Sequence, residues 1–372
     1  MLHGIVNVNK EKGYTSHDVV AKMRGILRQK RIGHAGTLDP DATGVLPVCV
    51  GNATRAVEFV SGQGKAYRAV LLLGRVTDTQ DATGDTLWEA RWEAGDAPPA
   101  PAGCGMAGWD AKDARSDVGP PGGGGMCADP GAGDGAQVRR PPTQEEVRGA
   151  ISHFIGGYAQ VPPMYSALRV GGKRLYELAR AGKEVEREPR WVDIADITIE
   201  CYDFPRVTMT VECSKGTYIR TLCHDIGQLL GVGGCMESLV RTRVGRFLLE
   251  DALTLGEIEG MVRGKAAAEP PVAEPPVAEP SGAEPEAGTG VDGAVHTFLH
   301  PVEELFGAFP RMQVLPGYGH LLRNGNPLGP GMVAQGTPGG QMVQMCDCDG
   351  RFVGIFAWNE DVGRWMPRKM FV

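Results

Sequence analysis

Two long stretches of the 372-residue chain are too rich in glycine, proline and acidic residues to contribute to a hydrophobic core. Residues 93–137 contain 12 Gly and 6 Pro among 45 residues. Residues 268–292 contain an imperfect Glu-Pro-Pro-Val-Ala repeat, which is typical of extended, polyproline-like chain. The fold must therefore be built from the three remaining segments. We expect the first stretch to be a disordered insertion and the second to be a linker.

The same two stretches account for the acidity of the chain. They carry net charges of −5 and −6, so the rest of the chain, against a total of −7, carries +4. A mildly basic folded part is compatible with a nucleic-acid partner, although the chain as a whole is acidic.

Other compositional features favour an intracellular protein. No apolar run approaches the roughly 20 residues that span a bilayer, and the first residues lack the pattern of a secretory signal. The nine cysteines are odd in number and scattered, which favours reduced thiols over a disulfide framework. Cys346-Asp347-Cys348 has no second ligand pair nearby, so thiols are favoured over a metal site. We therefore expect a cytoplasmic protein without membrane contact, metal or organic cofactor.

Outside the two stretches, hydrophobic periodicity predicts a mixture of strands and helices. Alternation and short apolar runs predict strands at residues 5–8, 48–50, 66–73 and 207–213. Three helices are predicted. The first begins at Ser16 as its cap, and the second begins with a capping box formed by Thr143 and Glu146. The third begins at residue 219 and ends at Gly231. From about residue 309, short strands around an Asp349-Gly350 hairpin signal predict a small β-rich region.

The most informative segment is residues 33–47, with the sequence GHAGTLDPDATGVLP. Its glycines and prolines predict a shaped loop between a helix and an apolar strand, and that loop presents one histidine and two carboxylates. Such a loop suits a functional site. The spacing alone equally allows a turn in which Asp39 or Asp41 only caps backbone amides.

This segment resembles the signature loop of the TruB family of bacterial tRNA pseudouridine-55 synthases. Further segments resemble other motifs of the family in the same order, so the resemblance spans about residues 4–92 and 140–250. These segments are 65–68 (KAYR), 162–168 (PPMYSAL), 175–180 (LYELAR) and 213–221 (CSKGTYIRT). The chain departs from the family pattern at Glu11, at Asp41 and in the run 238–241 (SLVR).

The resemblance implies roles for particular residues. Asp39 would be the catalytic nucleophile, Arg220 would pair with it and keep it ionised, and Tyr67 would lie against the target uracil. His34 would help to hold the flipped nucleotide, and Tyr218 would pack under the site. The remaining residues that the resemblance assigns to substrate binding are Gly33, Leu239 and Lys65.

The resemblance also implies an α+β fold, the pseudouridine-synthase fold, with a mixed, largely antiparallel sheet flanked by helices. We expect a catalytic domain at residues 1–262, a linker at 263–295 and a C-terminal β-rich, PUA-like RNA-binding domain at 296–372. The implied enzyme is an isomerase that converts uridine-55 in the T-arm of tRNA, and a monomer is expected. Two alternatives stay open, a synthase acting on another RNA and an RNA-binding chaperone for tRNA folding.

Overall fold

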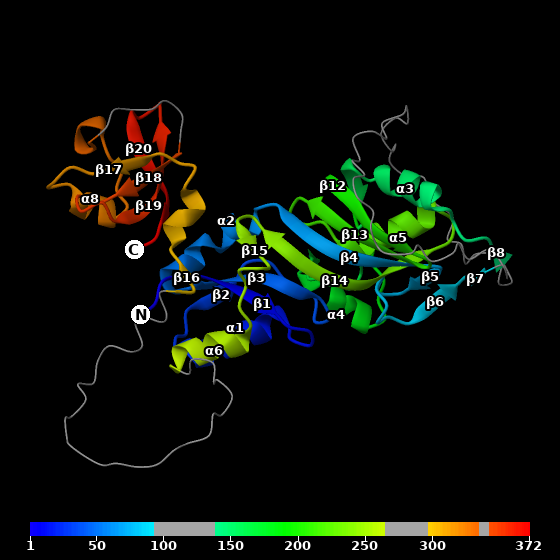
Figure 1. Ribbon diagram of the computed structural model, residues 1–372. Helices are drawn as coiled ribbons and strands as arrows, with labels where there is room; N and C mark the ends of the chain where they lie inside the picture. The colour runs from blue at the N-terminus through cyan, green and yellow to red at the C-terminus, as the bar shows by residue number, and fades with distance from the viewer. Residues whose placement is uncertain (93–137, 265–296, 335–341) are drawn as a thin grey trace, which may run out of the picture. The chain divides into compact units, whose positions relative to one another are not determined.

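The computed structural model describes residues 1–92, 138–264, 297–334 and 342–372, which divide into two compact units. The first unit comprises Met1–Pro40, Val45–Ser61 and Arg246–Val372, and the second comprises Asp41–Gly44 and Gly62–Gly245. The predicted insertion at 93–137 and most of the predicted linker at 263–295 lie outside the described residues. Most helices and strands of each unit are labelled in Figure 1.

The N-terminal part of the first unit consists of paired strands with helices packed on them. The strands follow the order β16-β1-β3, and β2 pairs antiparallel with β3. Residues of these strands form one apolar core with α1 and α6, including the fully buried Val6, Met23 and Ile258. The elements are β1 (Gly4–Lys10), α1 (Ser16–Leu27), β2 (Ile32–His34), β3 (Thr43–Val50), η1 (Gly51–Ala56), α2 (Val57–Ser61), β15 (Phe247–Leu248), α6 (Leu255–Val262) and β16 (Leu299–His300).

The cap of α1 differs from the sequence prediction. Thr15, and not Ser16, is the N-cap: its side chain accepts from Asp18 N, and the Asp18 carboxylate accepts from Thr15 N in a capping box. Ser16 is buried at 1% exposure and bonds to Leu38 instead. The prediction of Ser16 as the cap was therefore wrong, because two adjacent residues could cap and only Thr15 has an acidic residue three positions later.

The C-terminal part of the first unit is the predicted β-rich region. Four strands follow the order β17-β18-β19-β20 around a core that contains the fully buried Trp365 and Phe356. The hairpin between β18 and β19 turns at Asp349-Gly350 as predicted, with Gly350 at φ +79°. The elements are η3 (Val302–Phe306), β17 (Arg311–Gln313), α8 (Gly319–Arg323), η4 (Pro330–Met332), β18 (Met342–Cys346), β19 (Phe352–Asn359) and β20 (Arg364–Met370).

The second unit is built on a larger sheet with the order β3-β14-β4-β13-β12-β9. Only the β14–β3 pair is parallel among these strands, so the sheet is mixed and largely antiparallel, as predicted. The elements are β4 (Lys65–Leu73), β5 (Arg75–Thr77), β6 (Thr86–Glu89), β7 (Arg91–Trp92), β8 (Val138–Arg139), α3 (Gln144–Ser152), β9 (Gly156–Gln160), β10 (Arg169–Val170), β11 (Lys173–Arg174), α4 (Leu175–Arg180), β12 (Arg190–Asp203), β13 (Arg206–Cys213), α5 (Ile219–Leu229) and β14 (Gly234–Val244).

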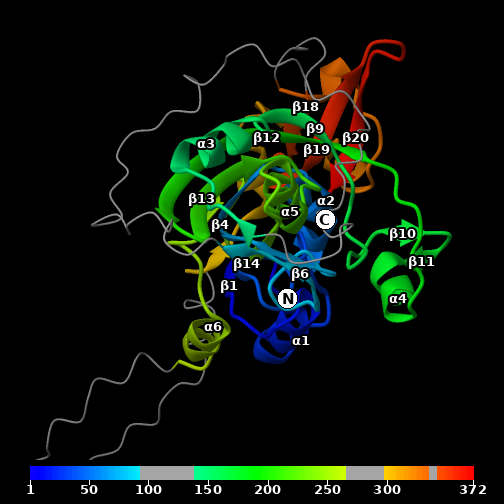
Figure 2. The ribbon, with the colours of Figure 1, turned by 90° about the vertical axis from the view of Figure 1, so that its right-hand side faces the viewer.

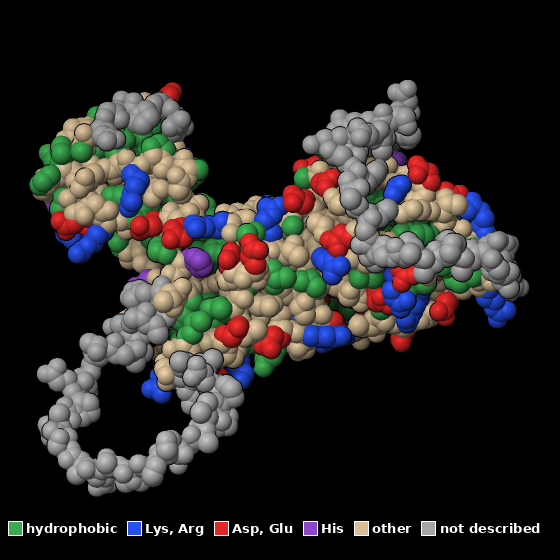
Figure 3. Space-filling model, in the orientation of Figure 1, with side chains coloured by type: hydrophobic (Ala, Val, Ile, Leu, Met, Phe, Trp, Pro, Cys, Tyr) green, Lys and Arg blue, Asp and Glu red, His purple; other side chains and the backbone are tan. Residues whose placement is uncertain are grey.

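The two faces of this larger sheet have different environments. One face is apolar and packs against α3 and α5, which contact β12, β14 and β4. The hairpin β10–β11 and α4 project from the sheet at a distance from these helices (Figure 2). The other face carries cross-strand ion pairs, and Figure 3 shows basic and acidic side chains interspersed on the surface. These pairs are Arg68–Glu200, Arg206–Glu237 and Arg243–Glu212.

Candidate active site

The loop that carries Asp39 is anchored on both sides of that residue. The Ser16 hydroxyl accepts from Leu38 N at 2.9 Å and donates to Leu38 O at 3.2 Å. The carbonyl of Pro40 accepts from Gly13 N at 2.9 Å and from the Lys10 ammonium at 2.9 Å. The backbone on either side of the half-buried Asp39 is therefore held in place by the hydrogen bonds of Leu38 and Pro40.

Lys10 is a buried cation that the sequence prediction missed. Its side chain is fully buried at the end of β1, and its ammonium donates to the carbonyls of Glu11 (3.1 Å), Tyr14 (2.6 Å) and Pro40 (2.9 Å). An ammonium has three N–H donors, so these three carbonyls use all of them. Lys10 therefore ties the turn after β1 to the loop of Asp39.

Gly33 and His34 lie on β2, a short strand at the beginning of the same loop. Gly33 pairs with Cys49 and His34 with Val48 on β3. The His34 ring packs edge-to-face against His17 of α1, with ring centroids 5.2 Å apart. The first unit thus brings together three of the predicted site residues, namely Gly33, His34 and Asp39.

Lys65 and Tyr67 lie on β4, with Leu239 on the neighbouring β14. Tyr67 is opposite Arg241 and Ala69 is opposite Leu239, so Tyr67 and Leu239 share one face of the sheet. All of these side chains are buried, Tyr67 at 7% and Leu239 at 9% exposure. Burial, together with the nearby Arg241, lowers the pKa of Lys65 to about 8.

Arg241 and Gly44 form a close contact that the sequence prediction also missed. Gly44 has φ +103°, and a Cβ there would lie 2.2 Å from the Arg241 carbonyl oxygen. A glycine is therefore required for the end of the signature motif to lie on β14. The Arg241 side chain is 1% exposed, a degree of burial that a cation reaches only with partners.

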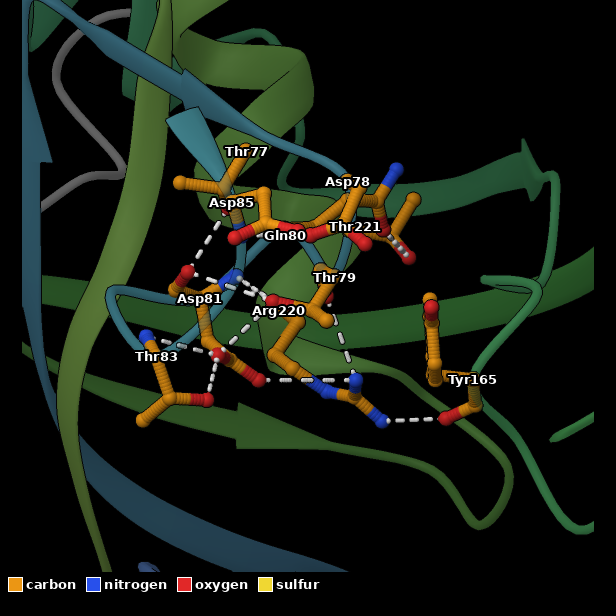
Figure 4. A network of polar contacts seen from close by, with 10 residues as sticks. All are labelled: Thr77, Asp78, Thr79, Gln80, Asp81, Thr83, Asp85, Tyr165, Arg220 and Thr221. Atoms are coloured by element: carbon orange, nitrogen blue, oxygen red, sulfur yellow. Dashed lines mark hydrogen bonds and ion pairs between the residues drawn. The ribbon is translucent and has the colours of Figure 1, made fainter. Parts of the chain in front are cut away.

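Arg220 lies in the first turn of α5 and is held by a loop between β5 and β6 (Figure 4). Its guanidinium donates to the carbonyl oxygens of Thr79 (3.1 Å) and Tyr165 (2.8 Å). It also forms an ion pair with Asp81 at 3.5 Å, and the side chain is 7% exposed. The planar guanidinium is thus oriented by three groups of the second unit.

The loop between β5 and β6 presents Asp81 in a fixed orientation (Figure 4). One carboxylate oxygen of Asp81 accepts from Thr79 Oγ1 (2.9 Å), Thr83 N (3.0 Å) and Thr83 Oγ1 (2.6 Å), and the other faces Arg220. Gln80 adopts φ +63°, so the residues on both sides of it reach the same nitrogen of Arg220. The sequence prediction missed this loop, although the alternation of threonine and aspartate at positions 79, 81 and 83 could have indicated it.

Tyr218, the remaining predicted site residue, is the N-cap of α5 and is half-buried. The second unit therefore contains five of the predicted residues, on β4, on β14 and at the start of α5, which packs on the apolar face of that sheet. These residues are Lys65, Tyr67, Tyr218, Arg220 and Leu239. Asp39 belongs to the first unit, and its pairing with Arg220 stays a prediction.

Among residues 1–92, 138–264, 297–334 and 342–372, no group of three or more histidine, cysteine, aspartate or glutamate side chains is arranged to hold a metal ion. No helix in these ranges has the length and apolar character needed to cross a membrane.

Two family models match the chain over most of its length. The N-terminal domain of the TruB family of pseudouridylate synthases matches residues 24–97 and 132–219, and the C-terminal domain of tRNA pseudouridylate synthase B matches residues 220–306. A tRNA pseudouridine synthase B of Lachnoclostridium phytofermentans is 37% identical over the full length of both chains. One of Heliobacterium modesticaldum is 47% identical over 68% of this chain and 69% of its own.

Solved structures show a similar fold at low sequence identity. A chain in an H/ACA ribonucleoprotein bound to a substrate RNA containing 2′-deoxyuridine aligns with a TM-score of 0.60 and 21% identity. A chain in a Cbf5-Nop10-Gar1 complex aligns with a TM-score of 0.61 and 22% identity. Each alignment covers 99% of this chain and 85% of the other.

The fold and the matched models define a pseudouridine synthase, an isomerase. The chain belongs to the TruB family of pseudouridylate synthases.

Proposed function

We propose that this enzyme converts uridine-55 in the T-arm of tRNA to pseudouridine, with Asp39 as the nucleophile. The observation that carries the proposal is the loop of Asp39, whose backbone is anchored on both sides of that residue, through Leu38 and Pro40, so that the position of Asp39 is defined. The relatives described above are named for tRNA, and this supports tRNA as the substrate.

The reaction breaks the bond from C1′ of the ribose to N1 of uracil and joins C1′ to C5 instead. An ionised carboxylate can form a covalent bond with the substrate, as in retaining glycosidases. Attack of Asp39 at C1′ would displace the uracil directly, whereas attack at C6 would form an adduct on the base. Both routes are compatible with a single carboxylate nucleophile, and the C5 proton must leave in either.

Other residues of the second unit supply orientation and binding. Arg220 would pair with Asp39, as the resemblance to the family implies, and its contacts with Thr79, Tyr165 and Asp81 would orient the guanidinium for that role. Tyr67 would stack on the extruded uracil, an interaction worth about 1–3 kcal/mol. His34 would hold the flipped nucleotide, with Gly33, Lys65, Tyr218 and Leu239 lining its surroundings.

The target uridine must leave its stack, which costs a few kcal/mol and must be offset by contacts to the RNA. Exposed basic residues on or after α1, Lys22, Arg24 and Arg28, are candidates for phosphate contacts. We also propose that the C-terminal β-rich region acts as a PUA-like RNA-binding domain and that the enzyme works as a monomer. Its location would be the cytoplasm, where tRNA is its substrate.

The test is Asp39→Asn beside the matched control Asp41→Asn. The two aspartates flank Pro40, and Asp41 is exposed. Asp39→Asn should lower single-turnover tritium release from uracil-labelled tRNA by at least about a thousandfold, since an amide cannot act as the nucleophile. Asp41→Asn should stay within a few-fold of wild type, and both variants should bind tRNA normally in a filter-binding titration.

Three outcomes would contradict the proposal. Turnover by Asp39→Asn within about tenfold of wild type would remove Asp39 from the mechanism. Carbodiimide-dependent primer extension on reacted tRNA must place the pseudouridine at position 55. Pseudouridine at another position, or only in ribosomal RNA fragments, would show that the enzyme acts on a different substrate. A chaperone without chemistry would be indicated if wild type itself released no tritium.

A further inference from the structure

Gln160, at the end of β9, holds the residue from which α5 begins. Its side-chain oxygen accepts from Tyr218 N at 2.8 Å, and its side-chain nitrogen donates to Tyr218 O at 3.0 Å. The same nitrogen donates its second hydrogen to the Tyr158 hydroxyl. Gln160 is 1% exposed, so the amide is buried with both donors and one acceptor satisfied.

The start of α5 depends on this contact more than on a cap of its own. Tyr218 is the N-cap and provides no side-chain cap hydrogen bond, although its carbonyl accepts from Leu222 N at 3.0 Å. An N-cap normally supplies an oxygen from its own side chain. Here a glutamine from a strand distant in the sequence binds both polar groups of the Tyr218 backbone instead.

The position of Arg220 follows from the position of Tyr218. Arg220 is two residues further along, in the first turn of α5, and its guanidinium must reach Thr79 O and Tyr165 O at once. A displacement of about 1 Å in a catalytic constellation can cost on the order of a hundredfold in rate. A contact that fixes the first turn of α5 therefore fixes the guanidinium.

We propose that Gln160 is a positioning residue for the reaction, acting through the backbone of Tyr218 to hold Arg220. The inference rests on the proposed function, because it assumes that Arg220 serves the reacting carboxylate. Gln160 itself lies at the far end of this chain of contacts and has no role in the chemical steps.

The chain contains a matched control for the same interaction. Gln29 accepts from Leu2 N at 2.9 Å and donates to Leu2 O at 2.9 Å, and it is buried at 9% exposure. Gln29→Glu thus disturbs an equivalent backbone contact at the N-terminal end of the chain. A loss of stability shared by Gln160→Glu and Gln29→Glu would come from breaking the backbone contact itself. A loss of rate seen only in Gln160→Glu would come from misplacement of Arg220.

The decisive readout is the pH dependence of single-turnover tritium release from about pH 5.5 to 8.5, because burial raises the pKa of a carboxyl group. In Gln160→Glu an ionised carboxylate cannot donate to Tyr218 O, but the protonated acid can donate through its O–H and accept through its C=O. The rate should therefore be lowered at least about tenfold at high pH and recover as the pH falls. Gln160→Met, which cannot donate at any pH, should stay slow throughout.

Wild type is measured across the same range because other titratable groups face Tyr158. Burial raises the pKa of Asp225 to about 7, so that group titrates within the range in every variant. Burial raises the pKa values of Cys213 and Cys223 far above the range, so their charge does not change.

Each outcome has a distinct meaning. Recovery of Gln160→Glu at low pH, without recovery of Gln160→Met, supports positioning. Rates of both Gln160 variants equal to wild type, with melting temperatures lowered as in Gln29→Glu, would overturn it. A slow Gln160→Glu that does not recover at low pH would also overturn it. If wild type released no tritium from tRNA, the proposed function would fail instead.

Discussion

Replacing Lys10 by methionine should destabilise the first unit and slow catalysis. The change removes the ammonium but keeps an unbranched side chain as far as Cε, so the carbonyls of Glu11 and Tyr14 lose this donor. The carbonyl of Pro40 keeps its bond from Gly13 N at 2.9 Å. An unsatisfied buried acceptor costs about 1–3 kcal/mol. Tyr14 is half-buried, whereas Glu11 is exposed and its carbonyl can bond to water, so we expect a net loss of about 1–3 kcal/mol.

The assay combines urea unfolding with single-turnover tritium release, using Lys12→Met as the control. Lys12 is an exposed lysine in the same turn, and its replacement should change the free energy of unfolding by less than about 0.5 kcal/mol. Lys10→Met should lower the rate at saturating tRNA about tenfold or more, because the loop of Asp39 loses one of its anchors. Equal stability and equal rates for the two variants would refute the reasoning.

Three further results are expected. Gly44→Ala should lower the free energy of unfolding by more than about 3 kcal/mol, because its Cβ would overlap the backbone of β14. In the control Gly13→Ala, where φ is +88° but the space around the residue is open, the loss should be only about 1–2 kcal/mol. Deleting residues 95–136 and 268–292 should leave the melting temperature nearly unchanged and tighten tRNA binding at low salt, as both are acidic; a large loss of melting temperature would contradict this. Because the folded-state pKa of Lys65 is lowered from 10.5 to about 8, the unfolded chain binds more protons between these values, so stability should rise with pH across that window. Lys65→Met should lack that part of the rise in urea unfolding.

The strands and helices that periodicity predicted are those in which the apolar positions of the sequence are also the buried positions of the structure. The strand at 207–213 alternates buried and half-buried side chains, and β13 spans Arg206–Cys213. The helix after Tyr218 ends before Gly231, which has φ +68°. In both cases the signal lies within a dozen residues, so an isolated sequence suffices to read it.

The parts of the site that sequence reasoning missed depend on distant partners. Lys10 is an ordinary lysine in the sequence, and only the folded turn and loop bring three carbonyls to its ammonium. Gln160 and Tyr218 are separated by 58 residues, and no local pattern marks a glutamine that binds another residue's backbone. The motif resemblance could identify Arg220, but the contact with Asp81 required the structure of the loop that presents it.

The first unit is assembled from both ends of the chain, since Ile5 of β1 pairs with His300 of β16. During synthesis on the ribosome, β1 emerges early but must wait for β16, while every residue of the second unit emerges before that strand. Pairing of two strands that are so far apart in the sequence is slow, although the entropic cost of closing the chain between them grows only weakly with its length. We therefore expect the second unit to fold first, with the loop of Asp39 among the last parts of the enzyme to reach its final structure.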